Sequence, residues 1–121
     1  MEGTNEERRY YPLDSRSSVF VFQLFGRSIQ QDTKAQRIII DDYLLDFSRT
    51  EYALMAVLLQ HAKQPGDFAS SIELSKICSR SPASRRALSR HIRKMSEKLW
   101  PFALDILNVG DQGYMLACKR E

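Results

Sequence analysis

The chain has 121 residues, of which 43% are hydrophobic and 27% are charged, and its formal net charge is +3. This size suits one globular domain and is too small for two, and no apolar run reaches the ~20 residues that span a bilayer. Residues 1–12 lack the apolar core of a signal peptide, so we expect a cytoplasmic protein without membrane association.

The N-terminal part of the chain predicts a tail followed by a small β-meander. Residues 1–17 are polar and carry both signs of charge, which predicts a flexible tail before one domain over residues 18–121. The β-branched and aromatic run 19–26 predicts a strand that is apolar on both faces. Turn-forming residues follow it and separate three further short strands, expected over 28–31, 37–40 and 43–47.

Two capping-box patterns then predict the starts of two helices. Ser48 and Glu51 precede a helix over 49–61. This helix is apolar almost all round, which is typical of a central, buried helix. The same spacing recurs at Ser70 and Glu73, before a shorter helix that ends near residue 78. The apolar residues that this shorter helix is expected to bury are Ile72, Leu74 and Ile77.

A third helix and a hairpin complete the predicted fold. Ser81 precedes a proline, which suits the first position of a helix over 82–99. Trp100 and the proline after it end this helix, and Trp100 itself is expected in the core. Alternating strands over 103–109 and 114–118 with a glycine-rich tip predict a hairpin. The two cysteines, Cys78 and Cys118, are expected to be reduced thiols in the core.

The third predicted helix has two opposite faces. Its apolar stripe consists of Leu88, Ile92, Met95 and Leu99. The opposite face carries Arg86, Arg90, Arg93 and Lys94, with Ser89 at its edge. Between Arg80 and Lys98 the chain has seven cations and one carboxylate, that of Glu97. A merely solvated face normally mixes signs, because like charges four residues apart repel. This clustering favours an anionic partner, above all the DNA major groove.

Three segments at fitting separations carry a resemblance to a known family. Residues 47–55 (FSRTEYALM) look like the start of its first helix, and residues 108–114 (NVGDQGY) look like the end of its wing. In the third helix the matching residues are Leu88, His91, Ile92, Met95 and Leu99. Arg86 matches the arginine that precedes this pattern in the family. The chain thereby resembles the winged-helix DNA-binding domain of OmpR/PhoB-type response regulators over roughly residues 19–116.

The resemblance implies an α+β fold: a winged helix-turn-helix with an N-terminal antiparallel β-meander, three helices and a C-terminal β-hairpin wing. It also implies sequence-specific binding of double-stranded DNA by a bacterial transcription regulator, with helix 82–99 in the major groove. A chain of this length leaves no room for the family's receiver domain, so we expect a stand-alone regulator. The wing differs from the family, because Gly110 replaces a frequent arginine and Met115 follows Tyr114. Tyr114 is expected to pack the wing onto the core.

The residues expected to contact DNA are Arg85, Arg86, Ser89, Arg90, Arg93, Lys94, Asn108 and Gln112. Arginine suits guanine or phosphate because it donates two parallel hydrogen bonds, whereas Arg85 flanks the apolar stripe and is expected to reach a phosphate at most. Glu97 either accepts a hydrogen bond from cytosine or, as we favour, pairs with Arg93 or Lys94. Four phosphate contacts would give a log–log salt slope of roughly −3.6.

The same residues are compatible with other functions. A winged helix can also serve as an adaptor, in which case the basic helix would bind an acidic protein. An RNA-binding role lacks stacking aromatic residues near that helix. The sequence shows no catalytic motif, phosphate loop or metal-ligand spacing, so we expect neither an enzyme nor a cofactor or metal. RNA polymerase or another regulator is the expected second partner, and the protein is expected to be a monomer or weak dimer on DNA.

Overall fold

The structure of the protein is a computed structural model that describes residues 18–78 and 84–118. The predicted tail (1–17) and the predicted helix start at Ser81 therefore lie outside the described residues. The elements, in chain order, are β1 (Val19–Leu24), β2 (Arg27–Asp32), β3 (Arg37–Ile40), β4 (Tyr43–Leu44), α1 (Arg49–Ala62), β5 (Ala69–Ser70), α2 (Ser71–Cys78), α3 (Ser84–Leu99), the 3-10 helix η1 (Trp100–Phe102), β6 (Leu104–Val109) and β7 (Gly113–Cys118).

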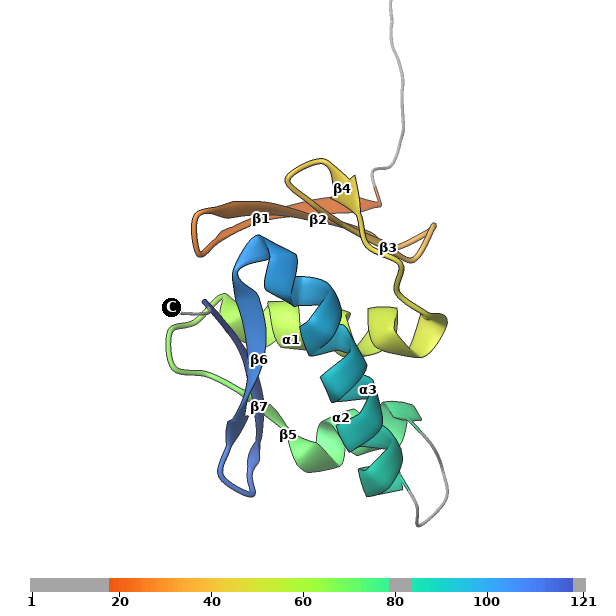
Figure 1. Cartoon of the computed structure of the whole chain (residues 1–121), viewed down its shortest axis with the longest axis vertical. Coiled ribbons are helices and arrows are strands. Elements are labelled where there is room, and N and C mark those ends of the chain that lie inside the picture. Colours follow the sequence, from red (N-terminus) through yellow and green to blue (C-terminus); the bar gives the residue numbers. More distant parts are fainter. Residues whose placement is uncertain (1–17, 79–83, 119–121) are drawn as a thin grey trace, which may run out of the picture.

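The strands form two antiparallel sheets, and the helices lie against both. The first sheet has the order β1-β2-β3-β4 and the second the order β5-β7-β6. Figure 1 shows the first sheet as a layer over one end of the helices, and the β6–β7 hairpin, here called the wing, beside α3. The predicted order of meander, three helices and hairpin is confirmed.

The meander is built on two tight turns with positive φ at both central residues. These turns are Phe25–Gly26 (φ 55° and 75°) and Asp41–Asp42 (φ 48° and 73°), the backbone of type I′ hairpins, whose twist matches that of the strands. The Asp41 carboxylate accepts hydrogen bonds from the Ser28 amide at 3.0 Å and from the Arg27 guanidinium at 2.7 Å. These bonds hold the pKa of Asp41 below its ordinary value.

The first and last strands of the meander are shorter than predicted, β2 is one residue longer at each end and β3 has the predicted bounds. Only one face of the sheet is buried. β1 ends at Leu24 because the next two residues form the turn, and β4 ends at Leu44 rather than at residue 47. The inner face carries Phe22, which is 7% exposed, whereas Val21 on the outer face of the same strand is 58% exposed. Among the described elements none covers this outer face, so β1 is apolar on both faces but buried on one.

The core lies between the first sheet, the helices and the wing. The predicted capping box of α1 is confirmed, since the Ser48 hydroxyl accepts from the Glu51 amide and the Glu51 carboxylate accepts from the Ser48 amide. The predicted apolar stripe of α3 is buried along its whole length. The largest fully buried side chains are Ile29, Ile38, Ile40, Leu54, Met55, Leu58, Leu59, Leu74, Met95, Leu99 and Leu104.

Several apolar residues are more exposed than the sequence predicted. In α2, Leu74 is buried but Ile72 is 66% exposed, because a short helix turns only one side to the core. Trp100 is 46% exposed, so its predicted place in the core is wrong; it begins a turn of 3-10 helix at the surface. Both cysteines are reduced thiols, as expected. Cys78 is half-buried and Cys118 is exposed, which corrects the prediction for Cys118.

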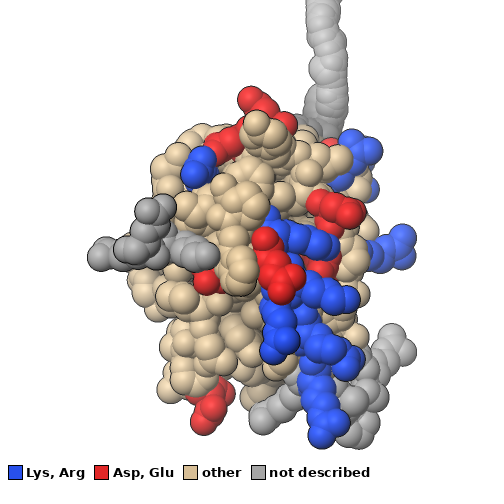
Figure 2. Space-filling model, viewed as in Figure 1, with Lys and Arg blue, Asp and Glu red and all other residues tan. Residues whose placement is uncertain are grey.

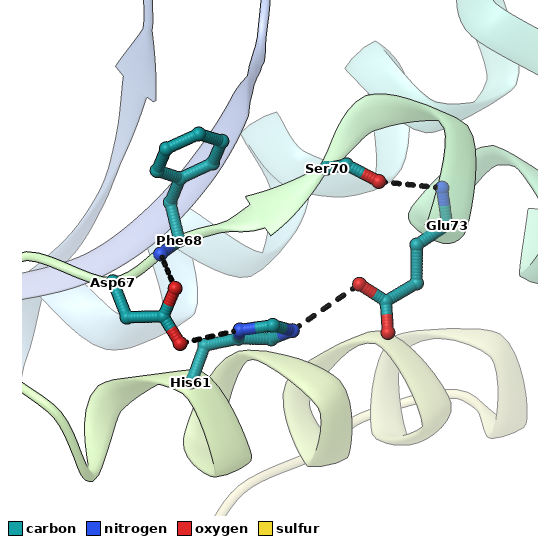
Figure 3. A network of polar contacts seen from close by, with 5 residues as sticks. All are labelled: His61, Asp67, Phe68, Ser70 and Glu73. Carbon is teal, nitrogen blue, oxygen red and sulfur yellow. Dashed lines mark hydrogen bonds and ion pairs between the residues drawn. The ribbon is translucent and has the colours of Figure 1, made fainter.

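A cluster of polar side chains joins the end of α1 to the start of α2 (Figure 3). The two ring nitrogens of His61 face two carboxylates, with Nδ1 at 2.8 Å from Asp67 Oδ2 and Nε2 at 3.2 Å from Glu73 Oε1. The Ser70 hydroxyl accepts from the Glu73 amide at 3.1 Å, which is half of the predicted capping box. The Glu73 carboxylate turns to His61 instead, so this histidine links the end of α1 to the first turn of α2.

Candidate nucleic-acid interface

The exposed cations of α3 form one continuous surface. Its residues are Arg86, Arg90, Arg93 and Lys94, with Ser89 beside them, and all five are exposed. We call this surface the basic face. Figure 2 shows it as a blue stripe that follows α3 down the molecule. Because the opposite stripe of α3 is buried in the core, the helix cannot roll, and its cations are held facing outward.

The remaining charged residues of this region are placed differently from the basic face. Arg85 belongs to α3, but its side chain lies outside the described residues. Glu97 is exposed, and no ion pair joins it to Arg93 or Lys94 in the described structure, so the predicted pairing does not form. An ion pair between two long, solvated side chains contributes little to stability, because holding both side chains in one geometry costs entropy.

A buried carboxylate holds the last turn of α3. Lys98 Nζ donates to Glu51 Oε1 at 2.8 Å and to the Asp46 carbonyl oxygen at 2.6 Å. Glu51 is only 3% exposed. Its burial alone would raise the pKa of its carboxyl, but hydrogen bonds from Lys98 and the Ser48 amide outweigh burial and lower it. The charge of Lys98 is therefore neutralised within the protein, and Lys98 orients α3 rather than adding to the basic face.

Next to this contact a second group of side chains surrounds a shallow hollow of about 350 Å³. It lies between the start of α1 and the C-terminal half of α3. The side chains that line it include His91 and Lys94 from α3 and Ser48 from α1. His91 is half-buried, and when it is protonated its charge favours the ionised form of the Glu51 carboxyl. Because Asp46 and Glu51 line the hollow together with Lys94 and Lys98, its charges are mixed and it does not extend the basic face.

The wing lies beside the basic face and encloses a larger hollow with it. This hollow of about 510 Å³ is lined by Ser71, Leu88, Ser89, Asn108, Gly110, Asp111 and Tyr114. Asn108 and Gln112, the two wing residues predicted to contact DNA, are both exposed. Only Asn108 lines the hollow, whereas the Gln112 backbone carbonyl accepts from the Ser71 amide at 2.9 Å. Tyr114 packs against the core, as predicted.

The geometry brings most of the predicted residues to one side of the molecule. Five of them form the basic face and two stand on the wing beside it. Two features of this region were not predicted from the sequence: the tie between Lys98 and Glu51, and the position of Asp111 at the hollow. The S-x-x-E pattern identified Glu51 as a capping residue, but its second contact joins residues far apart in the chain.

Comparison with known proteins supports the fold. No protein-family model and no curated protein sequence matches the chain. Among solved structures, the protein is similar to the crystal structure of the DNA-binding domain of the response regulator AdeR in complex with an intercistronic region. The TM-score is 0.62 and the sequence identity is 28%, and the match covers 74% of this chain and 94% of that chain. Together with the order of its elements, this similarity shows that the chain has the winged-helix fold of OmpR-type DNA-binding domains.

Proposed function

We propose that the protein binds double-stranded DNA, and that it does so as a stand-alone bacterial transcription regulator in the cytoplasm. The row of exposed cations on α3, opposite a fully buried stripe, is the observation that carries this proposal. The similarity to a DNA-binding domain in a DNA complex supports it. No helix in the described part of the chain has the length and apolarity to cross a membrane.

The mechanism follows from the shape of α3. A helix with one free face fits the major groove, where Arg86, Arg90 and Arg93 can donate paired hydrogen bonds to guanine or to phosphate oxygens. Lys94 neutralises a phosphate as a point charge. Arg85 is proposed to reach a phosphate at the flank. Each phosphate contact releases condensed counterions, so the affinity falls steeply with salt concentration.

The remaining proposed contacts lie around α3. Ser89 is short enough to reach a base edge or a phosphate, and Asn108 and Gln112 on the wing are proposed to donate to the adjacent backbone. A single domain of this kind makes few base contacts, so a repeated site, a weak dimer on DNA or a second protein such as RNA polymerase is proposed to add affinity.

The test is selection from a pool of random duplex DNA at two salt concentrations, followed by sequencing. We expect an enriched motif that is retained less well at the higher salt. Arg90→Ala with Arg93→Ala should weaken binding at least tenfold and make the log–log salt slope shallower by about 1 for each phosphate that the variant no longer neutralises. Lys34→Ala with Arg37→Ala removes the same charge from the exposed β2–β3 turn and should change the affinity by less than about twofold.

One observation favours a second candidate, an adaptor that binds an acidic protein. Between Leu104 and Cys118 the wing contains no lysine or arginine, so it adds no positive charge to the surface that would bind a nucleic acid. If the pool gives no retention even at low salt, the DNA proposal is wrong. Failure of the Arg90/Arg93 variant to bind an acidic protein partner, with no DNA retention, would then identify the adaptor.

A further inference from the structure

The tip of the wing is fixed relative to β5 and the start of α2. β5 pairs with β7 through Ala69 with Tyr114 and Ser70 with Gly113, and the Ser71 amide donates to the Gln112 carbonyl at 2.9 Å. A Cβ on Gly113 would collide with the Ala69 carbonyl oxygen, so the two backbones touch. Residues next to this contact therefore keep a constant position beside the helix-turn-helix.

The fixed tip presents a carboxylate, although the family that the sequence resembles often has an arginine in the wing. Asp111 is exposed and lines the hollow together with Ser89 of α3 and Asn108 of β6. It forms no hydrogen bond or ion pair with the described residues. Figure 2 shows acidic atoms at the tip of the wing, apart from the blue stripe along α3. An unpaired carboxylate held beside a cationic helix is free to accept a hydrogen bond from a ligand of that helix.

If the tip of the wing lies in the minor groove of the bound DNA, the base edges there limit the donors from which this carboxylate can accept a hydrogen bond. An A·T pair presents only acceptors there, whereas a G·C pair adds one donor, the N2 amino group of guanine. A-tracts also have a narrow minor groove with strong negative potential, which attracts cationic side chains and disfavours a carboxylate. An ionised Asp111 therefore matches a G·C pair and is mismatched to an A·T pair.

We propose that the tip of the wing enters the minor groove next to the site that α3 contacts, and that Asp111 there makes the wing select a G·C base pair. The carboxylate accepts a hydrogen bond from guanine N2. This inference rests on the proposed function and deepens it, because it assigns a base preference to a wing that has no cation of its own.

The test uses the duplex selected by the full chain, with each guanine outside the α3 motif replaced in turn by inosine. Inosine keeps the major-groove edge of guanine and lacks the N2 amino group. We expect one replacement to weaken binding of the native protein about tenfold. Asp111→Ala should bind the guanine and inosine duplexes equally, while Lys34→Ala with Arg37→Ala, outside the proposed DNA contacts, should still discriminate between them.

The other outcomes would overturn either the role of Asp111 alone or the proposed function as well. An intact α3 motif with equal binding of guanine and inosine at every flanking position would overturn the role of Asp111 alone. Persistent discrimination in Asp111→Ala would do the same, since another group would then read the amino group. Retention of duplex DNA without any selected motif would also overturn the role of Asp111, whereas no retention even at low salt would overturn the proposed function and the role of Asp111 with it.

Discussion

The two ends of α1 are each tied to a neighbouring helix by charged side chains, but the two ties differ in burial. At the start of α1, Glu51 is 3% exposed and holds Lys98 of α3 at 2.8 Å. At its end, the His61 side chain is 29% exposed, and its partners Asp67 and Glu73 are more exposed still. Electrostatic contacts strengthen as water is excluded. The orientation of α3 therefore depends on a strong tie and that of α2 on a weak one.

The two ties also respond to pH in opposite ranges. The pKa of Glu51 lies below its ordinary value of 4.5, so its stabilising contribution is complete above that pH and is lost as pH falls through the lowered value. The pKa of His61 is raised above 6.5, first by the hydrogen bond to Asp67. Its contribution is complete below 6.5 and is lost as pH rises through the raised value.

The largest effect is expected from breaking the buried tie. Lys98→Met removes the cation and leaves the Glu51 carboxylate buried, which should lower the free energy of unfolding by about 2 kcal/mol at neutral pH. Urea denaturation of the native and variant proteins measures this difference. It should shrink as pH falls, starting at a higher pH than the native Glu51 titration, because burial raises the pKa of the Glu51 carboxyl and the variant has no Lys98 to oppose it. Lys94→Met, one turn earlier on the exposed side of α3, should leave stability nearly unchanged; an equal loss there would contradict a specific tie.

A smaller and pH-dependent effect is expected at the other end of α1. His61→Gln should cost about 0.5–1 kcal/mol near pH 5.5, and the loss should fade as pH rises above the raised pKa of His61. The cost is read from denaturation curves across this pH range. As a control, His61→Gln is also made in a protein that carries Asp67→Asn and Glu73→Gln. There it should have little effect on stability at any pH, because both carboxylates that contact His61 are gone. A cost that does not vary with pH would mean that His61 acts by packing alone.

The smallest effect is expected from salt, and it separates the two ties directly. At about 1 M sodium chloride, charges on exposed side chains are screened within about 3 Å. The cost of His61→Gln should then fall by about half or more, whereas the cost of Lys98→Met should change much less because Glu51 is shielded from the solvent. Denaturation at low and high salt measures the cost of each substitution. If salt reduced the costs of His61→Gln and Lys98→Met equally, the two contacts would not differ in their shielding from solvent.

Local signals predicted most of the fold correctly. The capping box at Ser48 and the apolar stripe of α3 each depend on residues within a few positions of one another, and both are confirmed. The tight turns of the meander and the hairpin of the wing are local in the same way. The exposed cations of α3 follow from the same periodicity, so the basic face could be predicted without any knowledge of tertiary contacts.

Features that depend on distant parts of the chain could not be predicted in this way. The strand β5 exists only because Ala69 meets Tyr114, and the contact of Glu51 with Lys98 joins two helices. The exposure of Ile72 and Trp100 was missed because apolar character alone does not say which side of an element is covered. The predicted pairing of Glu97 failed for a different reason, since helical spacing permits an ion pair without making it stable.

The pairing of β5 with β7 has a consequence for the order in which the protein folds. The meander hairpins and the three helices form from near neighbours, whereas Ala69 can meet Tyr114 only after the whole α2–α3 segment has been brought into a closed loop. We infer that the β5–β7 contact forms last during folding and opens first in partial unfolding. The Ser71 amide, which donates to Gln112, reports this step: its hydrogen exchange should be faster than that of the amides inside α1.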